Sequence, residues 1–280
     1  MKITYYGTAA AEGFPGLFCS CEACERARAA GGKNIRTRSQ ALIDGELLID
    51  FPADTYLHVL NYGLELRDVK SILITHGHDD HMYPMDFEYR KVGYAYFDVD
   101  EDELTPVPVH MSHDTSEVFC KDKDMNDLEK RHAFRCVQTT AFVPFETIGY
   151  TVTPLEADHA AYLQPRMYII QKDGKTLLYG HDSGYYPEST WEYLAKTKPH
   201  FDFVSLDCTG IVLDYERGHM GIKGCERVRD RLLQMGTADE KTLFCLHHFS
   251  HNGRLTYDEL KAVADEKGLL VSYDGAQFEF

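Results

Sequence analysis

The chain has 280 residues, of which 44% are hydrophobic, so it is long enough to build a substantial core. Its formal net charge of −16 at pH 7 argues against a nucleic-acid-binding surface and against docking on anionic membranes, because both need basic surfaces. We predict a single domain over residues 1–280, since no linker, repeat or low-complexity segment divides the sequence.

The eight cysteines do not indicate a disulfide framework. The first residues lack the apolar run of a signal peptide, and no segment approaches the ~18 apolar residues that span a bilayer. We therefore expect a cytoplasmic protein with reduced thiols. Cys19, Cys21 and Cys24 form a Cys-x-Cys-x-x-Cys run, which supplies three of the four ligands of a structural zinc site. The run leaves the fourth ligand open, and three free cysteines on a loop are the alternative.

Short strands and turns follow in the first half of the chain. Residues 2–6 are predicted to form an edge strand, and residues 41–43 and 47–49 a hairpin around Asp44-Gly45. A helix is predicted over residues 53–62, because Gly63 follows as a stop signal. The apolar run at 72–74 predicts a short buried strand.

Four polar residues follow that strand within six positions: His76, His78, Asp80 and His81. Buried polar groups need hydrogen-bond or ionic partners, and four such side chains on one tight turn would need several of them. A divalent metal ion supplies such a partner, because neutral imidazole and carboxylate are preferred ligands of zinc and its neighbours. We therefore predict a metal site in this loop, with a merely histidine-rich polar loop as the alternative.

Residues 82–104 interleave aromatic side chains with acids from Asp98 to Glu103. We predict an aromatic and acidic insertion that lines or covers a substrate pocket. An ordinary surface segment that packs on the core explains the same composition equally well. Beyond it, the pattern predicts a strand at 107–110, a charged helix at 112–132 and a strand at 135–137.

The second half repeats a strand followed by a polar loop. Strands are predicted at 150–155, 167–171, 176–179, 203–206 and 243–246, helices at 188–196, 220–235 and 256–266, and a terminal hairpin around Asp274-Gly275. His159, Asp182 and His248 each follow a predicted strand. Residues at the ends of adjacent strands converge on one edge of a sheet, so we expect these three to meet His76.

This order of residues resembles the metallo-β-lactamase-fold hydrolases. The resemblance implies an α/β fold, a four-layer αβ/βα sandwich, with two divalent ions (zinc, manganese or iron) at its edge. One ion would take His76, His78 and His159, the other Asp80, His81 and His248, with Asp182 bridging both. By the same likeness, Asp50 supports the histidine loop from behind.

A narrower similarity is to the phosphoribosyl cyclic phosphodiesterases, the PhnP-like group. Its members combine the cysteine run with a His-x-Ser-His motif, which is His248-Phe249-Ser250-His251 here. The resemblance implies that His251 completes the zinc site of Cys19, Cys21 and Cys24. It also implies that His219 donates a proton or holds the phosphate, with His181 as the second candidate. The related pyrroloquinoline quinone biosynthesis protein lacks the full His-x-His-x-Asp-His motif. The presence of this motif here therefore favours a hydrolase.

We predict a binuclear metal-dependent hydrolase, a phosphodiesterase that attacks a small or cyclic phosphodiester through a metal-bridging hydroxide. Its catalytic residues would be Asp80, Asp182 and His219. A lactonase or thioesterase on the same metals is the alternative, because a fold does not fix the chemistry. The charge weighs against a tRNA 3′-processing nuclease, and the full ligand set against a non-catalytic metal carrier. A homodimer is implied by the resemblance alone.

Overall fold

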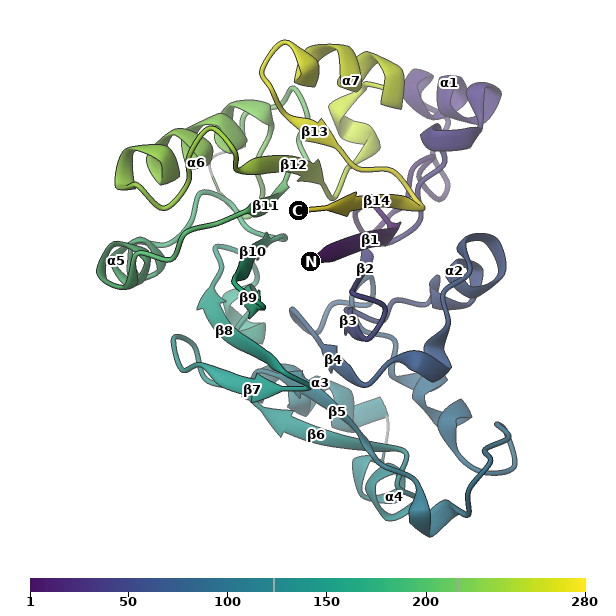
Figure 1. Cartoon of the computed structure of the whole chain (residues 1–280). Coiled ribbons are helices and arrows are strands. Elements are labelled where there is room, and N and C mark those ends of the chain that lie inside the picture. Colours follow the sequence, from purple (N-terminus) through teal and green to yellow (C-terminus); the bar gives the residue numbers. More distant parts are fainter. Residues whose placement is uncertain (123, 216) are drawn as a thin grey trace.

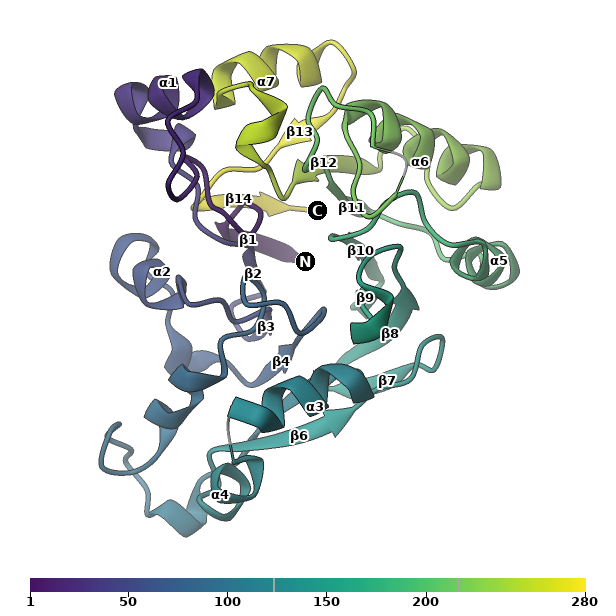
Figure 2. The same cartoon turned by 180° about the vertical axis from the view of Figure 1, so that it is seen from behind.

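The computed structural model describes residues 1–122, 124–215 and 217–280. Two β-sheets lie face to face, with helices on their outer sides (Figure 1). The view from behind shows the same layers, with the two chain ends close together near the middle (Figure 2). There the amino group of Met1 donates to the carbonyl of Phe280 over 3.1 Å.

Among the described residues, the first sheet has the strand order β14-β1-β2-β3-β4-β5-β6. Its strands are β1 (Lys2–Gly7), β2 (Gln40–Ile43), β3 (Leu47–Ile49), β4 (Ser71–Leu73), β5 (Val107–Met111), β6 (Phe134–Gln138) and β14 (Ala276–Glu279). Strands β3, β4 and β5 are parallel, so their carboxyl ends reach the same edge of the sheet.

The second sheet has the order β13-β12-β11-β10-β9-β8-β7 within the described part of the chain. Its strands are β7 (Phe145–Thr147), β8 (Tyr150–Glu156), β9 (Arg166–Lys172), β10 (Lys175–Gly180), β11 (Phe203–Asp207), β12 (Leu243–His247) and β13 (Leu270–Val271). Strands β10, β11 and β12 are parallel, and β8 runs the same way because both β8 and β10 are antiparallel to β9.

The α-helices are α1 (Glu22–Ala30), α2 (Thr55–Tyr62), α3 (His113–Asp122), α4 (Met125–Lys130), α5 (Glu188–Thr197), α6 (Ile222–Met235) and α7 (Tyr257–Asp265). The predicted helix over 112–132 is therefore two helices. The second one is capped by Asp124, whose carboxylate accepts from the backbone N–H groups of Asn126 and Asp127. None of the helices in the described ranges has the length and apolar character of a membrane span.

Three layers of apolar side chains hold the sheets and helices together. The strands are apolar at successive positions because both faces of each sheet are covered: Leu47 and Ile49 face the other sheet, whereas Leu48 packs under the helices. Leu177 and Leu178 divide in the same way on the second sheet. The layers therefore follow the order helix, sheet, sheet, helix, which confirms the predicted αβ/βα sandwich.

Segment 82–104 packs on the outer side of the first sheet. It forms the 3₁₀ turns η3 (Pro84–Arg90) and η4 (Glu101–Glu103). Phe87 is fully buried against the rings of Phe51 and Phe134, while Tyr96 is 89% exposed. Three pockets are lined in part by this segment, and none of their described lining residues is a predicted metal ligand. The structure thus agrees with a surface segment packed on the core.

Two predictions about the ends of the chain are wrong. Asp274-Gly275 does not turn a hairpin, because β13 pairs with β12 in the second sheet and β14 with β1 in the first. The turn carries the chain from one sheet to the other, and the Asp274 carboxylate is held by the hydroxyls of Thr8 and Thr37. Since β14 is added outside β1, the predicted edge strand is an interior strand.

Candidate metal centre

The loops that follow β4, β8, β10 and β12 meet at one edge of the two sheets. Three side-chain clusters with the spacing of metal ligands lie there among the described residues, and two of them together hold all seven predicted ligands of the catalytic pair. Asp182 and His248 have φ values of 46° and 62°, so the chain turns sharply as it leaves each strand. Such left-handed backbone costs free energy in residues other than glycine.

The first cluster consists of His76, His78, His159 and Asp182. Nδ1 of His78 lies 2.8 Å from Nε2 of His76 and 3.2 Å from Nε2 of His159. Oδ2 of Asp182 lies 3.3 Å from Nε2 of His76. On the far side of the His78 ring, Nε2 lies 3.2 Å from the hydroxyl of Tyr162, a residue that the sequence did not single out.

The second cluster consists of Asp80, His81, Asp182 and His248. Nε2 of His81 lies 2.9 Å from Oδ2 of Asp182, 3.2 Å from Oδ2 of Asp80 and 3.3 Å from Nε2 of His248. Oδ2 of Asp182 therefore faces both clusters. This is the position that a carboxylate shared by two ions would take.

The spacing and bonding of these atoms fit divalent metal ions. Ligand atoms around a tetrahedral zinc ion with Zn–N bonds of 2.0–2.1 Å lie about 3.3 Å from one another. The separations above scatter around this value. Oδ1 of Asp182 is buried and has no hydrogen-bond partner of acceptable geometry in the described chain, although Nδ1 of His248 is only 2.9 Å away. A buried carboxylate in this state needs a cation.

Buried groups behind the ligands fix their orientation. Nδ1 of His81 donates to Asp50 over 2.6 Å, which leaves Nε2 facing the cluster. Asp50 also accepts from the backbone N–H and the hydroxyl of Thr75, at 2.8 and 3.0 Å. Burial lowers the pKa values of His76 and His159, which favours the neutral imidazole that binds metals. Asp50 thus lies where the resemblance implied.

A third cluster contains a residue that sequence reasoning missed. Asp207, the last residue of β11, is fully buried and accepts from the backbone N–H groups of Thr209 and Met220. Its Oδ2 lies 3.1 Å from Nδ1 of His219, which is also 3.7 Å from Asp182. Burial opposes a charge on His219, but the two carboxylates outweigh it and raise its pKa. The sequence feature that could have identified Asp207 is its position at the end of a predicted strand, which it shares with the predicted ligands.

Residues 217–221 include His219 and are anchored beside the first cluster. The guanidinium of Arg217 donates to the carboxylate of Asp158 from Nε at 2.9 Å and from Nη2 at 2.6 Å. The backbone N–H of Gly218 donates to the same carboxylate, and its carbonyl lies 3.2 Å from Nδ1 of His159. When this carbonyl accepts a hydrogen bond from Nδ1 of His159, Nε2 of the same ring is directed toward the cluster.

Two other histidines next to the ligands lie between the sheets. His181 contacts the hydroxyl of Ser205, and His247 those of Ser39 and Ser272. Their rings stack on each other with centroids 4.1 Å apart, and neither belongs to a cluster with metal-ligand spacing among the described residues. The structure thus places His181, the second candidate for the proton donor, away from the metal centre.

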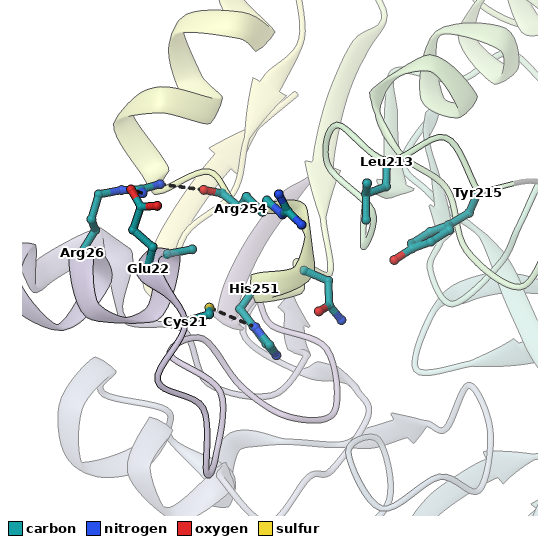
Figure 3. A pocket seen from close by; sticks show the side chains of 9 residues that line it. Cys21, Glu22, Arg26, Leu213, Tyr215, His251 and Arg254 are labelled. Atoms are coloured by element: carbon teal, nitrogen blue, oxygen red, sulfur yellow. Dashed lines mark hydrogen bonds and ion pairs between the residues drawn. The ribbon is translucent and has the colours of Figure 1, made fainter.

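Cys19, Cys21, Cys24 and His251 form a separate cluster. Nδ1 of His251 lies 3.5 Å from Sγ of Cys19 and 3.6 Å from Sγ of Cys21, and Figure 3 shows the contact with Cys21. A thiolate and an imidazole on one zinc ion lie about 3.6 Å apart. The backbone N–H of Cys24, at the start of α1, lowers the pKa of Cys21 to about 6, which favours the thiolate that zinc binds.

Comparisons with known proteins agree with this architecture. The family model described as "Beta-lactamase superfamily domain" matches residues 50–249, which is 200 of the 280 residues. No curated protein matches the sequence. A diphosphatase from the PhnP family is 18% identical with a TM-score of 0.73, covering 100% of this chain and 98% of the other.

Two further solved structures are similar over the whole chain. Zn²⁺-bound PqqB from Methylobacterium extorquens is 17% identical with a TM-score of 0.71, and the match covers 100% of both chains. The short form of human tRNase Z is 16% identical with a TM-score of 0.62, covering 100% of this chain and 99% of the other. At such identities the structures show the fold alone. The match to the family model and the buried clusters show that the chain belongs to the metallo-β-lactamase superfamily and is a metal-dependent hydrolase of that fold.

Proposed function

We propose that this protein is a binuclear metal-dependent phosphodiesterase that hydrolyses a small or cyclic phosphodiester. The observation that carries the proposal is the shared carboxylate of Asp182, which faces both ligand clusters and lies 3.7 Å from His219. One ion would be held by His76, His78 and His159, the other by Asp80, His81 and His248, and both by Asp182. When bound, two divalent ions supply Lewis-acid activation of water and neutralise charge on phosphoryl oxygens.

The pair of His219 and Asp207 supplies the proton for the leaving group. Asp207 accepts from Nδ1 of His219 at 3.1 Å and favours the charged ring. The other ring nitrogen, Nε2, has no partner among the described residues, so it is free to donate to a leaving oxygen. The buried position of Asp207 and its backbone hydrogen bonds hold the ring in this orientation.

This proton donor favours a phosphodiester over a thioester. An alkoxide leaves a phosphodiester poorly without a proton, whereas opening a thioester releases a thiolate that leaves more readily. The net charge of −16 argues against tRNA as the substrate. The full-length similarity to a PhnP-family diphosphatase supports phosphoester chemistry only at the level of the fold.

Hydrolysis of bis(p-nitrophenyl) phosphate and a cyclic nucleoside phosphodiester, compared with a lactone and thioester panel, tests the proposal. We expect diester hydrolysis that is lost on chelation and in Asp80→Ala. The matched control is Asp79→Ala in the same loop, because Asp79 is exposed and outside the clusters. Turnover of lactones or thioesters without diester hydrolysis would refute the phosphodiesterase assignment. Tight tRNA binding at low salt would favour the nuclease.

A further inference from the structure

Three loops of the metal centre meet at Asp158. Each carries one residue of the proposed site, and the loops with these residues are 157–160 with His159, 181–184 with Asp182 and 217–221 with His219. Asp158 belongs to none of the metal-ligand clusters of the described chain, yet its N–H, its carbonyl and its carboxylate each bind one of the other two loops. From this position it can align the site without touching a metal ion.

The backbone of Asp158 binds the loop that carries Asp182. Its N–H donates to the hydroxyl of Ser183 over 3.0 Å, and its carbonyl accepts from the N–H of Gly184 over 2.9 Å. Asp182 has a φ of 46°, a backbone conformation that persists in such a residue only where its surroundings impose it. The two hydrogen bonds hold the chain directly after the carboxylate that faces both clusters.

The side chain of Asp158 binds the loop that carries His219. Its carboxylate accepts from Nε and Nη2 of Arg217 at 2.9 and 2.6 Å, and from the backbone N–H of Gly218 at 3.1 Å. The side chain of Asp158 is 12% exposed, whereas that of Arg217 is 84% exposed. Two nitrogens of one guanidinium on one carboxylate fix direction as well as distance, and the third bond fixes the backbone of the loop itself.

The placement of Gly218 sets the orientation of two functional rings. Its carbonyl lies 3.2 Å from Nδ1 of His159, and the next residue in the chain is His219. The two rings have their centroids 4.9 Å apart. A shift of Gly218 would therefore disturb the metal ligand and the proton donor together.

The three loops pack too closely for a side chain at Gly184. A Cβ atom there would lie 2.6 Å from Oδ2 of Asp158, 2.8 Å from the backbone nitrogen of Gly218 and 3.1 Å from the carbonyl carbon of Arg217. Two of these three are backbone atoms, so relieving the contact would require the 217–221 loop to move. The close approach of the loops thus depends on Gly184 as well as on Asp158.

We propose that Asp158 is a positioning residue. By fixing Arg217 and Gly218, it holds the ring of His159 toward the metal centre and the ring of His219 beside the leaving group. The part that concerns His219 rests on the phosphodiesterase proposed above, whereas the fixing of the loop and of His159 does not. The state of the loop, the retention of metal and the transfer of a proton are therefore measured separately.

Asp158→Asn removes the ion pair and keeps the size of the side chain. In the protein as purified, we expect amide hydrogen exchange of residues 217–221 to become at least about fivefold faster, because the loop loses its anchor. Gly184→Ala should act in the same direction, since its Cβ separates the loops. Asp158→Asn should also lose its catalytic ions at about tenfold lower chelator concentration than the parent, because the orientation of His159 is no longer fixed.

Asp202→Asn is the matched control. Asp202 is 23% exposed and also accepts from one cation and one backbone N–H, those of Lys175 and Thr176, each at 2.9 Å. This group lies at the start of β10, whereas the metal centre lies beyond its end. The control should leave the exchange of residues 217–221 and the retention of metal within about twofold of the parent.

Kinetics at saturating metal test the link to His219. Asp158→Asn should lower kcat about tenfold for a diester with an alkoxide leaving group and little for p-nitrophenolate, which needs no proton. In a His219→Ala background the same substitution should cost no more than about twofold, because the ring that it misplaces is already gone.

Parent-like exchange of residues 217–221 in Asp158→Asn, or equal losses of kcat in both backgrounds, would overturn the proposal. A parent that does not hydrolyse diesters would refute the phosphodiesterase instead. The exchange and chelator measurements would then still decide whether Asp158 fixes the loop and His159.

Discussion

Removing one thiol of the cysteine cluster should destabilise the fold by a calculable amount. Helix α1 has only nine residues, and three of them, Ala23, Cys24 and Ala27, are buried, so it buries too little apolar surface to hold itself in place. The cluster attaches it to His251, 230 residues after Cys21 in the chain. We therefore expect a bound zinc ion to supply most of the attachment, and Cys21→Ser to release it.

The magnitude follows from the number of ligands. Structural zinc sites supply roughly 10–16 kcal/mol through four ligands, so one ligand accounts for about 3 kcal/mol. A chain of this length has an unfolding entropy of about 0.6 kcal/mol per kelvin. Dividing the two predicts that Cys21→Ser melts about 5 °C below the parent.

Calorimetry and elemental analysis on the same samples measure this effect. Cys120→Ser is the matched control, because Cys120 is exposed on α3 and outside the clusters of the described residues. This variant should have the melting temperature and the zinc content of the parent. After all metal is removed, the parent and Cys21→Ser should have the same melting temperature. Equal melting points with metal present would refute the zinc site, and a gap that persists without metal would show that Cys21 acts through packing.

Three further results are expected. Asp182→Ala should abolish hydrolysis while the fold is retained, and normal turnover would exclude Asp182 from the site. The parent should contain about three metal ions per chain, one of them bound by thiolates, as X-ray absorption can show; a single ion would contradict the binuclear site. His219→Ala should lower kcat about 100-fold for a diester with an alkoxide leaving group but little for p-nitrophenolate, which needs no proton. Equal losses on both substrates would indicate that His219 binds phosphate and does not donate a proton.

The sequence alone predicted the ligands that lie close together in the chain. His76, His78, Asp80 and His81 share one short loop, and the cysteines share another, so their spacing already indicates that each group contributes to one metal centre. All predicted ligands lie in clusters with metal-ligand spacing. The sandwich was implied by the family resemblance that these motifs carry, and the structure confirms it.

Residues that depend on the packing of distant segments were harder to find. Asp207 follows a strand as Asp182 does, but only the fold brings it within 3.1 Å of His219, twelve residues later in the chain. Tyr162 was missed altogether, because an exposed tyrosine in a loop carries no local signal of its contact with His78. The prediction of a hairpin around Asp274-Gly275 was wrong for a related reason. The Asp-Gly pair specifies a turn, but it does not specify the sheet that the next strand joins.

The sequence by itself determined the chemistry of this protein: which side chains can bind metal, and that they follow strands. Only the tertiary structure showed what the residue next to each of two predicted ligands does. In His247-His248 and in His181-Asp182, one residue of each pair faces the gap between the sheets and the other faces the metal centre. Each ligand lies just beyond the end of a strand, where the chain turns with a positive φ, so the direction of its side chain depends on where the neighbouring strands and the second sheet lie. That placement is set by contacts between residues far apart in the chain.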